Sequence, residues 1–148
     1  MTEREIWRAH GRVLVDGRAV GVALVLSEPL SFWGGLDIRD GTIIDERHPQ
    51  CGQSVQGRAL VMPGGRGSSS SSSVLAEAIR GGTGPAAILL ARPDEIVALG
   101  ALVVSMLDGI SCPVLEMLPA DYARFVSRDL VDVGADGQVV VKRAGALV

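Results

Sequence analysis

Apolar and polar residues alternate along the first part of the chain in the manner of half-buried strands. Residues 6–15 alternate in this way, and the apolar stretch 19–27 follows as a second strand. The turn residues Asp16, Gly17 and Arg18 lie between them. This pattern predicts a hairpin at the start of the chain.

The middle of the chain predicts two strand–helix units. Residues 57–63 favour a strand bounded by glycine and proline, and residues 74–80 favour a helix that ends at Gly81. Residues 85–91 form a short apolar run that is typical of a buried strand. A helix that opens at Pro93 is apolar on every side, which predicts burial on most of its faces.

The remaining segments complete a mixed pattern. Residues 28–49 predict a long loop with a short strand at 42–45, and residues 112–117 predict a further buried strand. Residues 119–126 favour a short helix or turn, and residues 129–143 favour a C-terminal hairpin. Strands at both ends with two βα units between them predict a layered mixed α/β fold, not an all-parallel one.

Composition bounds the fold and the partners. The 148 residues fit one domain, 1–148, and a hydrophobic fraction of 47% with 3% aromatic residues predicts an aliphatic core. The net charge of −3 and the scattered basic residues argue against a nucleic-acid partner. No apolar run reaches the roughly 20 residues of a membrane span, and the charged start lacks a signal peptide's apolar region. We expect a cytoplasmic protein without a membrane partner.

Two cysteines, Cys51 and Cys112, are present without a CxxC spacing. In a cytoplasmic chain such cysteines are expected to be free thiols. His10 and His48 do not stand in a ligand pattern with them. We therefore assign no metal site to this chain alone.

The stretch "VMPGGRGSSSSSSVLAEAIRGG" contains six consecutive serines, Ser68 to Ser73. A flexible linker is unfavourable here, because Val61 and Val74 on either side belong to predicted regular elements. A phosphate-binding Walker loop would need a lysine that is missing, and Ser70 occupies the last glycine position of a GxGxxG pattern. What remains is a strand, a glycine-rich turn and a helix that begins with exposed hydroxyls.

This arrangement has a functional and a structural interpretation. Gly64, Gly65 and Gly67 allow positive φ and close backbone approach, and the start of a helix attracts an anion. Arg66 can add a bidentate contact to a carboxylate or phosphate. Alternatively, the serines only cap the helix and pack tightly. The residues alone leave both interpretations open.

Three motifs in order, "LSFWGG", "DERHP" followed by "GQS", and "GGRGSSS", make this chain resemble the small swivel-domain subunit of the aconitase X family. A later "ALGAL" agrees, and the resemblance runs from about Gly21 to Cys112. It implies a single layered β/β/α domain that swivels like the mobile domain of aconitase. It also implies a large catalytic subunit that holds an iron–sulfur cluster.

The resemblance further implies a hydro-lyase reaction in which Ser68 is the proton acceptor. An unaided serine hydroxyl is a poor base, so it needs a pocket rich in donors. Gly67 and the first N–H groups of the helix would stabilise the alkoxide, with Arg66 nearby. Ser69 and Ser70 would hydrogen-bond a substrate carboxylate.

Other motif residues carry two interpretations each. Phe32 and Trp33 either plug the edge of the core or, beside a neighbouring subunit, form a pocket wall and interface. His48 either contacts substrate as an acid or holds its loop by a hydrogen bond. Because the cysteines lie outside the motifs, the resemblance leaves the cluster ligands to the large subunit and implies that the isolated chain is inactive.

The resemblance implies two competing substrates. Bacterial two-subunit members dehydrate cis-3-hydroxy-L-proline to a pyrroline carboxylate, whereas archaeal members dehydrate phosphomevalonate. The Ala-, Gly-, Arg- and Val-rich composition with few lysines favours the bacterial substrate. A non-catalytic anion-binding module and a purely structural subunit stay open as further hypotheses.

Overall fold

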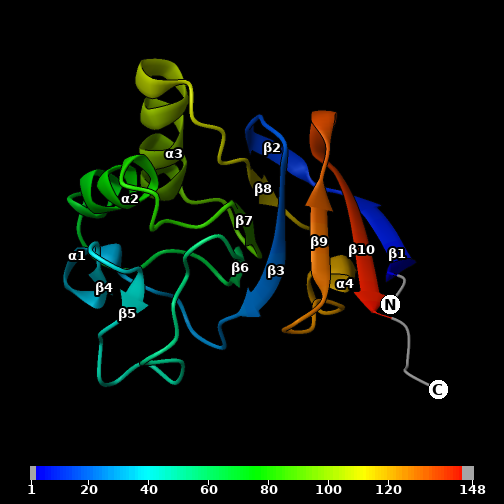
Figure 1. Cartoon of the computed structure of the whole chain (residues 1–148), viewed down its shortest axis with the longest axis horizontal. Helices are drawn as coiled ribbons and strands as arrows, with labels where there is room; N and C mark the ends of the chain where they lie inside the picture. The colour runs from blue at the N-terminus through cyan, green and yellow to red at the C-terminus, as the bar shows by residue number, and fades with distance from the viewer. Residues whose placement is uncertain (1–2, 145–148) are drawn as a thin grey trace.

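The computed structural model describes residues 3–144 and contains an eight-stranded mixed sheet with helices packed on part of it (Figure 1). The strands of this sheet lie in the order β1-β10-β9-β3-β6-β7-β8-β2, and β4 and β5 form a separate ribbon. In chain order the elements are β1 (Glu3–His10), β2 (Arg12–Val15), β3 (Ala19–Val25), α1 (Phe32–Gly35), β4 (Leu36–Asp37), β5 (Thr42–Ile43), β6 (Ala59–Met62), α2 (Ser71–Arg80), β7 (Ala87–Leu90), α3 (Glu95–Asp108), β8 (Val114–Glu116), α4 (Pro119–Tyr122), β9 (Leu130–Val133), a 3-10 turn (Ala135–Gly137) and β10 (Gln138–Ala144).

The sheet has a parallel and an antiparallel part. Strands β3, β6, β7 and β8 are parallel, and α2 and α3 form the crossovers between β6, β7 and β8. Both helices lie on the same side of the sheet, as Figure 1 shows. Strands β1, β10 and β9 continue it in antiparallel pairs, and the predicted C-terminal hairpin is the β9–β10 pair. The mixed α/β prediction is therefore confirmed.

Strands β6 and β7 are buried on both faces and form the centre of the molecule. Leu60 and Ile88 point into the core under the helices, while Val61 and Leu89 point into a second core on the other face. All four side chains are fully buried. Because successive residues of a strand face opposite ways, such double burial requires the continuous apolar run seen in the sequence.

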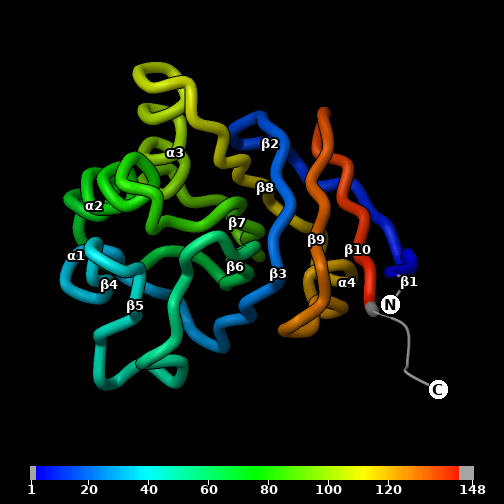
Figure 2. The backbone as a smooth tube through the Cα atoms, viewed as in Figure 1, coloured from blue at the N-terminus to red at the C-terminus, as the bar shows by residue number. Residues whose placement is uncertain are grey.

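The prediction of one strand over residues 6–15 is wrong, because Gly11 separates β1 from β2. The Gly11 N–H donates to the Gly137 carbonyl at 2.9 Å, and a Cβ at Gly11 would lie 2.8 Å from the Met117 sulfur. Before Gly11, β1 pairs with β10 at one end of the strand order. After Gly11, β2 pairs with β8 at the opposite end. One stretch of chain thus supplies both edge strands, and Figure 2 traces its path.

The predicted N-terminal hairpin is also wrong. Strand β3 pairs with β9 on one side and β6 on the other, and not with β2. The connection between β2 and β3 is held by Ser111, whose hydroxyl accepts a hydrogen bond from the Arg18 N–H at 3.1 Å. Strand β3 therefore lies in the middle of the sheet, between β9 and β6.

Helix α3 is apolar on every side, but the prediction that most of its faces are buried is wrong. One face packs inward through Val97, Ala101 and Val104. Four large apolar side chains are exposed on it: Leu99, Leu102, Met106 and Leu107. Within residues 3–144, no helix is long and apolar enough to cross a bilayer.

Helix α2 begins at Ser71, three residues before the predicted start, and it ends at Gly81 as predicted. It packs closely on α3, since a Cβ on Gly100 would lie 2.7 Å from the Ser72 carbonyl oxygen and 3.2 Å from the Leu75 Cβ. Gly100 is therefore the residue that lets the two helices approach each other.

Replacing Gly100 by Ala should lower the thermal unfolding temperature, although alanine favours a helix by about 1 kcal/mol. The new methyl group meets a backbone carbonyl that no rotamer change can move, and overpacking of this kind costs about 1–3 kcal/mol. Leu107→Ala, an exposed change in the same helix, should leave the unfolding temperature close to that of the wild type. An unchanged or higher unfolding temperature for Gly100→Ala would contradict the tight contact.

Candidate active site at the carboxyl edge of the parallel strands

The parallel strands β3, β6 and β7 end at one edge of the sheet, and the segments that follow them meet there. Ligands of open α/β sheets bind in crevices outside such carboxyl ends. A small cavity of about 60 Å³ lies at this edge. Its lining residues come from all three segments: Leu30, Phe32, Gly65, Arg66, Gly67, Ser68, Ser71, Asp94, Ile96 and Val97.

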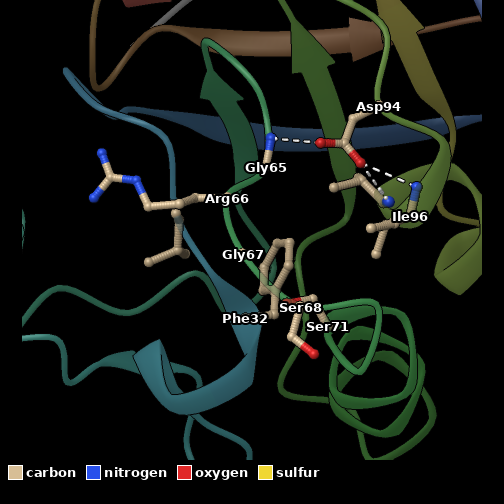
Figure 3. Close-up of a pocket in the computed structure, with 10 residues that line it drawn as sticks. Phe32, Gly65, Arg66, Gly67, Ser68, Ser71, Asp94 and Ile96 are labelled. Atoms are coloured by element: carbon tan, nitrogen blue, oxygen red, sulfur yellow. Dashed lines mark hydrogen bonds between the residues drawn. The ribbon is translucent and has the colours of Figure 1, made fainter.

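The backbone of the glycine-rich loop is held from two sides. The Gly65 N–H donates to Asp94 Oδ2 at 2.9 Å, as Figure 3 shows, and the Arg66 N–H donates to the Leu30 carbonyl at 3.2 Å. A Cβ on Gly65 would lie 2.7 Å from the same Asp94 oxygen. Only glycine lets the loop lie so close to this carboxylate.

Ser68 lies at the turn between this loop and α2. The preceding Gly67 has a φ of +91°, and a Cβ there would lie 3.0 Å from Ser31 Oγ. The exposed Ser68 hydroxyl accepts a hydrogen bond from the Ser70 N–H at 3.1 Å. In the part of the chain that the structure describes, the N–H groups of Gly67, Ser68 and Ser69 have no hydrogen-bond partner. Ser68 thus lies in a turn with available backbone donors, just before the positive end of a helix.

Among the next serines, Ser71 is the one that lines the cavity. Ser69 and Ser70, which we predicted to contact substrate, are exposed and do not line it. Ser71 is only 4% exposed, and sequence analysis missed it. Its position could have been found from periodicity, since Ser71, Leu75 and Ala78 fall on one helical face.

The aromatic turn before the loop forms a wall of the same cavity. Phe32 is fully buried and lines it, whereas Trp33 is 58% exposed. The Trp33 N–H donates to Ser71 Oγ at 3.1 Å, and the Ser31 hydroxyl donates to the Trp33 carbonyl at 2.9 Å. Gly34 has a φ of +77°, which sharpens the turn. These bonds tie the aromatic turn to the start of α2.

Arg66 lies on the rim of the cavity. Its guanidinium is 3.5 Å from a Glu28 carboxylate oxygen, and both side chains are about half exposed. In Figure 3 the Arg66 side chain extends away from Asp94. Because an exposed ion pair of this kind is worth only about 0–1 kcal/mol, Arg66 can turn toward an incoming anion at little cost.

His48 is buried but does not line the cavity. Its Nδ1 accepts the Gln50 N–H at 3.0 Å, so that the Nε2–H donates to the Glu28 carbonyl at 3.1 Å. Both ring nitrogens are therefore engaged with the backbone. This geometry favours the loop-holding interpretation over a contact with substrate.

The family model described as the aconitase X swivel domain matches residues 8–142. The chain belongs to the aconitase X swivel-domain family. A crystal structure of Thermococcus kodakaraensis aconitase X, holo-form, superposes on this swivel domain with a TM-score of 0.79 at 32% identity, covering 91% of this chain and 98% of that one. A solution NMR structure of a UPF0107 protein matches with a TM-score of 0.78 and 35% identity. The expected swivel-domain fold is confirmed.

Two kinds of dehydratase are among the curated relatives of the swivel domain. A cis-3-hydroxy-L-proline dehydratase of Pseudomonas aeruginosa is 54% identical over 70% of this chain, and one of Hypocrea jecorina is 34% identical over 93% of it. This chain spans 18% and 23% of their lengths, about a fifth. A phosphomevalonate dehydratase small subunit of Methanosarcina acetivorans is 32% identical, and the match covers 95% of this chain and 96% of that one.

The residues of this swivel domain do not fit an iron–sulfur cluster, which the aconitase-like family generally uses. Cys51 is exposed, whereas Cys112 is fully buried. Within residues 3–144, no group of three or more His, Cys, Asp or Glu side chains is placed to hold a metal ion. Burial also raises the pKa of the Cys112 thiol to about 12, which disfavours the thiolate that metals bind.

The two cysteines should differ sharply in their reaction with a thiol reagent at pH 8. Because the pKa of Cys112 is about 12, only about one molecule in ten thousand carries its thiolate at that pH. Ellman's reagent should therefore detect one thiol per folded chain and two after denaturation. A Cys51→Ser variant should show none while folded, and a rapid reaction of Cys112 in that variant would contradict its burial.

Proposed function

We propose that this chain is the small subunit of a two-subunit hydro-lyase that dehydrates a small hydroxy acid, with Ser68 as the proton acceptor. The observation that carries the proposal is the position of Ser68, which lines a cavity at the carboxyl edge of the sheet. The turn that holds it, just before α2, has three N–H groups without a partner among the described residues. The dehydratase names of the relatives support the reaction class.

Ser68 would act on the substrate's C–H bond. That bond breaks, its proton passes to the Ser68 oxygen, its electron pair forms the C=C bond, and the C–O bond breaks to release hydroxide. A neutral serine hydroxyl is a poor base, so it must be ionised or assisted by donors that stabilise the alkoxide. The N–H groups of Gly67 and Ser69 and the positive end of α2 would supply that stabilisation.

Arg66 would hold the substrate's carboxylate. Its guanidinium is free to leave Glu28 and can bind both carboxylate oxygens. The exposed hydroxyls of Ser69 and Ser70, which follow Arg66 in the same segment, would add hydrogen bonds. Since the cavity of about 60 Å³ is too small for a whole substrate, the reacting part would enter it and the rest would lie outside, beside Trp33.

The substrate we favour is cis-3-hydroxy-L-proline, which would yield a pyrroline-2-carboxylate. The support is the 54% identity to the Pseudomonas aeruginosa relative, against 32–40% for the relatives named phosphomevalonate dehydratase small subunit. Phosphomevalonate is the alternative.

The large subunit is the proposed partner, and we assign to it the iron–sulfur cluster and the groups that receive the departing hydroxide. The name "small subunit" of several relatives supports such a partner. The apolar side chains exposed on α3 agree with a chain that meets another protein surface.

To test the proposal, this chain is assembled with an aconitase X large subunit, and the complex is assayed for dehydration of both substrates. Ser68→Ala should lower kcat by about 100-fold or more, the scale of lost general-base catalysis, while the complex stays assembled. Ser73→Ala is the matched control, since it removes an exposed hydroxyl from the same serine run away from the cavity.

Each result separates the hypotheses. Turnover of phosphomevalonate alone would replace the favoured substrate, and turnover of neither by a cluster-loaded complex would contradict both. A Ser68→Ala complex that binds substrate weakly but keeps its kcat would favour an anion-binding module. If Ser68→Ala leaves both kcat and KM unchanged, this chain has only a structural role in the complex.

A further inference from the structure

We propose that Asp94 is a positioning residue that keeps Ser68 in place by anchoring the glycine-rich loop to the start of α3. The inference deepens the proposed function and rests on the role given there to Ser68. Asp94 lies after β7, whereas Ser68 lies after β6, so the anchor joins two neighbouring crossovers of the sheet.

One carboxylate receives three backbone donors. Asp94 Oδ1 accepts the N–H groups of Ile96 and Val97 at 3.0 Å each, which caps α3. Asp94 Oδ2 accepts the Gly65 N–H at 2.9 Å, and Figure 3 shows these bonds fanning out from the side chain. The two oxygens have separate tasks, one for the helix and one for the loop.

The bond from the Gly65 N–H to Asp94 holds the loop three residues before Ser68. Hydrogen bonds to an ionised carboxylate are about twice as strong as neutral ones. On its other side the same loop bonds to the Leu30 carbonyl through the Arg66 N–H. If the Asp94 bond is lost, the remaining backbone bonds are the one to Leu30 and the Arg92 N–H to the Pro63 carbonyl at 3.2 Å, which holds the chain before the first glycine. Neither replaces the tie at Gly65, so the donors near Ser68 lose their fixed position.

The variant Asp94→Asn separates the two tasks. Asparagine caps helices about as well as aspartate, so its oxygen can keep the bonds to Ile96 and Val97. Its NH₂ group then faces the Gly65 N–H, and two donors cannot bond. The matched control is Glu95→Gln, which removes the same charge from the adjacent exposed residue in the first turn of α3.

The first measurement is amide hydrogen exchange by NMR on the full chain. In Asp94→Asn the Gly65 amide should exchange at least 10-fold faster than in the wild type, while the Ile96 and Val97 amides and the unfolding temperature stay close to it. Asp94→Ser gives a second test, because a serine hydroxyl can cap α3 but is too short to reach Gly65.

The second measurement is kinetics of the complex with the large subunit. Displacement of a reacting group by about 1 Å can cost about 100-fold in rate. We therefore expect both Asp94 variants to lose about 10- to 100-fold in kcat with little change in KM, and Glu95→Gln to keep its kcat.

Several results would overturn the inference. An unchanged exchange rate of the Gly65 amide in both Asp94 variants would contradict the claim that Asp94 anchors the loop. Faster exchange of the Gly65 amide with an unchanged kcat would show that the anchor does not position Ser68. An equal loss of kcat in Glu95→Gln would show that the loss comes from the change of charge alone. An inactive wild-type complex would instead contradict the proposed function, and the exchange experiment would still decide whether Asp94 anchors the loop.

Discussion

Close backbone approach at three glycines is the constraint on which this edge of the molecule depends. Gly65 lies against the carboxylate that opens α3, Gly67 lies against Ser31, and Gly100 brings α3 against the first turn of α2. Any side chain at these points would enter another group's volume. The glycine loop, the aromatic turn and both helix starts are therefore packed as one unit, and Ser68 takes its position from all of them.

The local elements of this unit could be predicted from the sequence. A strand, a glycine turn and a helix follow directly from the periodicity of residues 57–80, and the structure has them in that order. The strand pairing could not be predicted in this way. Nothing within residues 6–27 reveals that β3 pairs with β6 and β9, because those partners lie far along the chain. An apolar helix such as α3 also gives no local sign of how many of its faces the fold covers.

The site residues also divide into those that a local motif predicts and those that depend on how distant segments pair. Ser68 and Arg66 were predicted as site residues from a motif, and the structure places both at the cavity. Ser71 also lines it and could have been predicted from the helical period. Asp94 was visible only as a helix opening, since its bond to Gly65 depends on the pairing of β6 with β7. For His48 the sequence left two interpretations open, because the backbone partners of its ring depend on the path of the loop.

The break at Gly11 has a consequence for the order in which the fold assembles. Residues 3–10 are synthesised well before residues 138–144, with which they pair. Contacts of such long sequence separation slow folding, because the intervening chain must be ordered before they can form. Residues 12–15 find β8 sooner. During synthesis β2 can thus pair while β1 still lacks its partner, and this eight-stranded sheet is complete only after β10 has emerged.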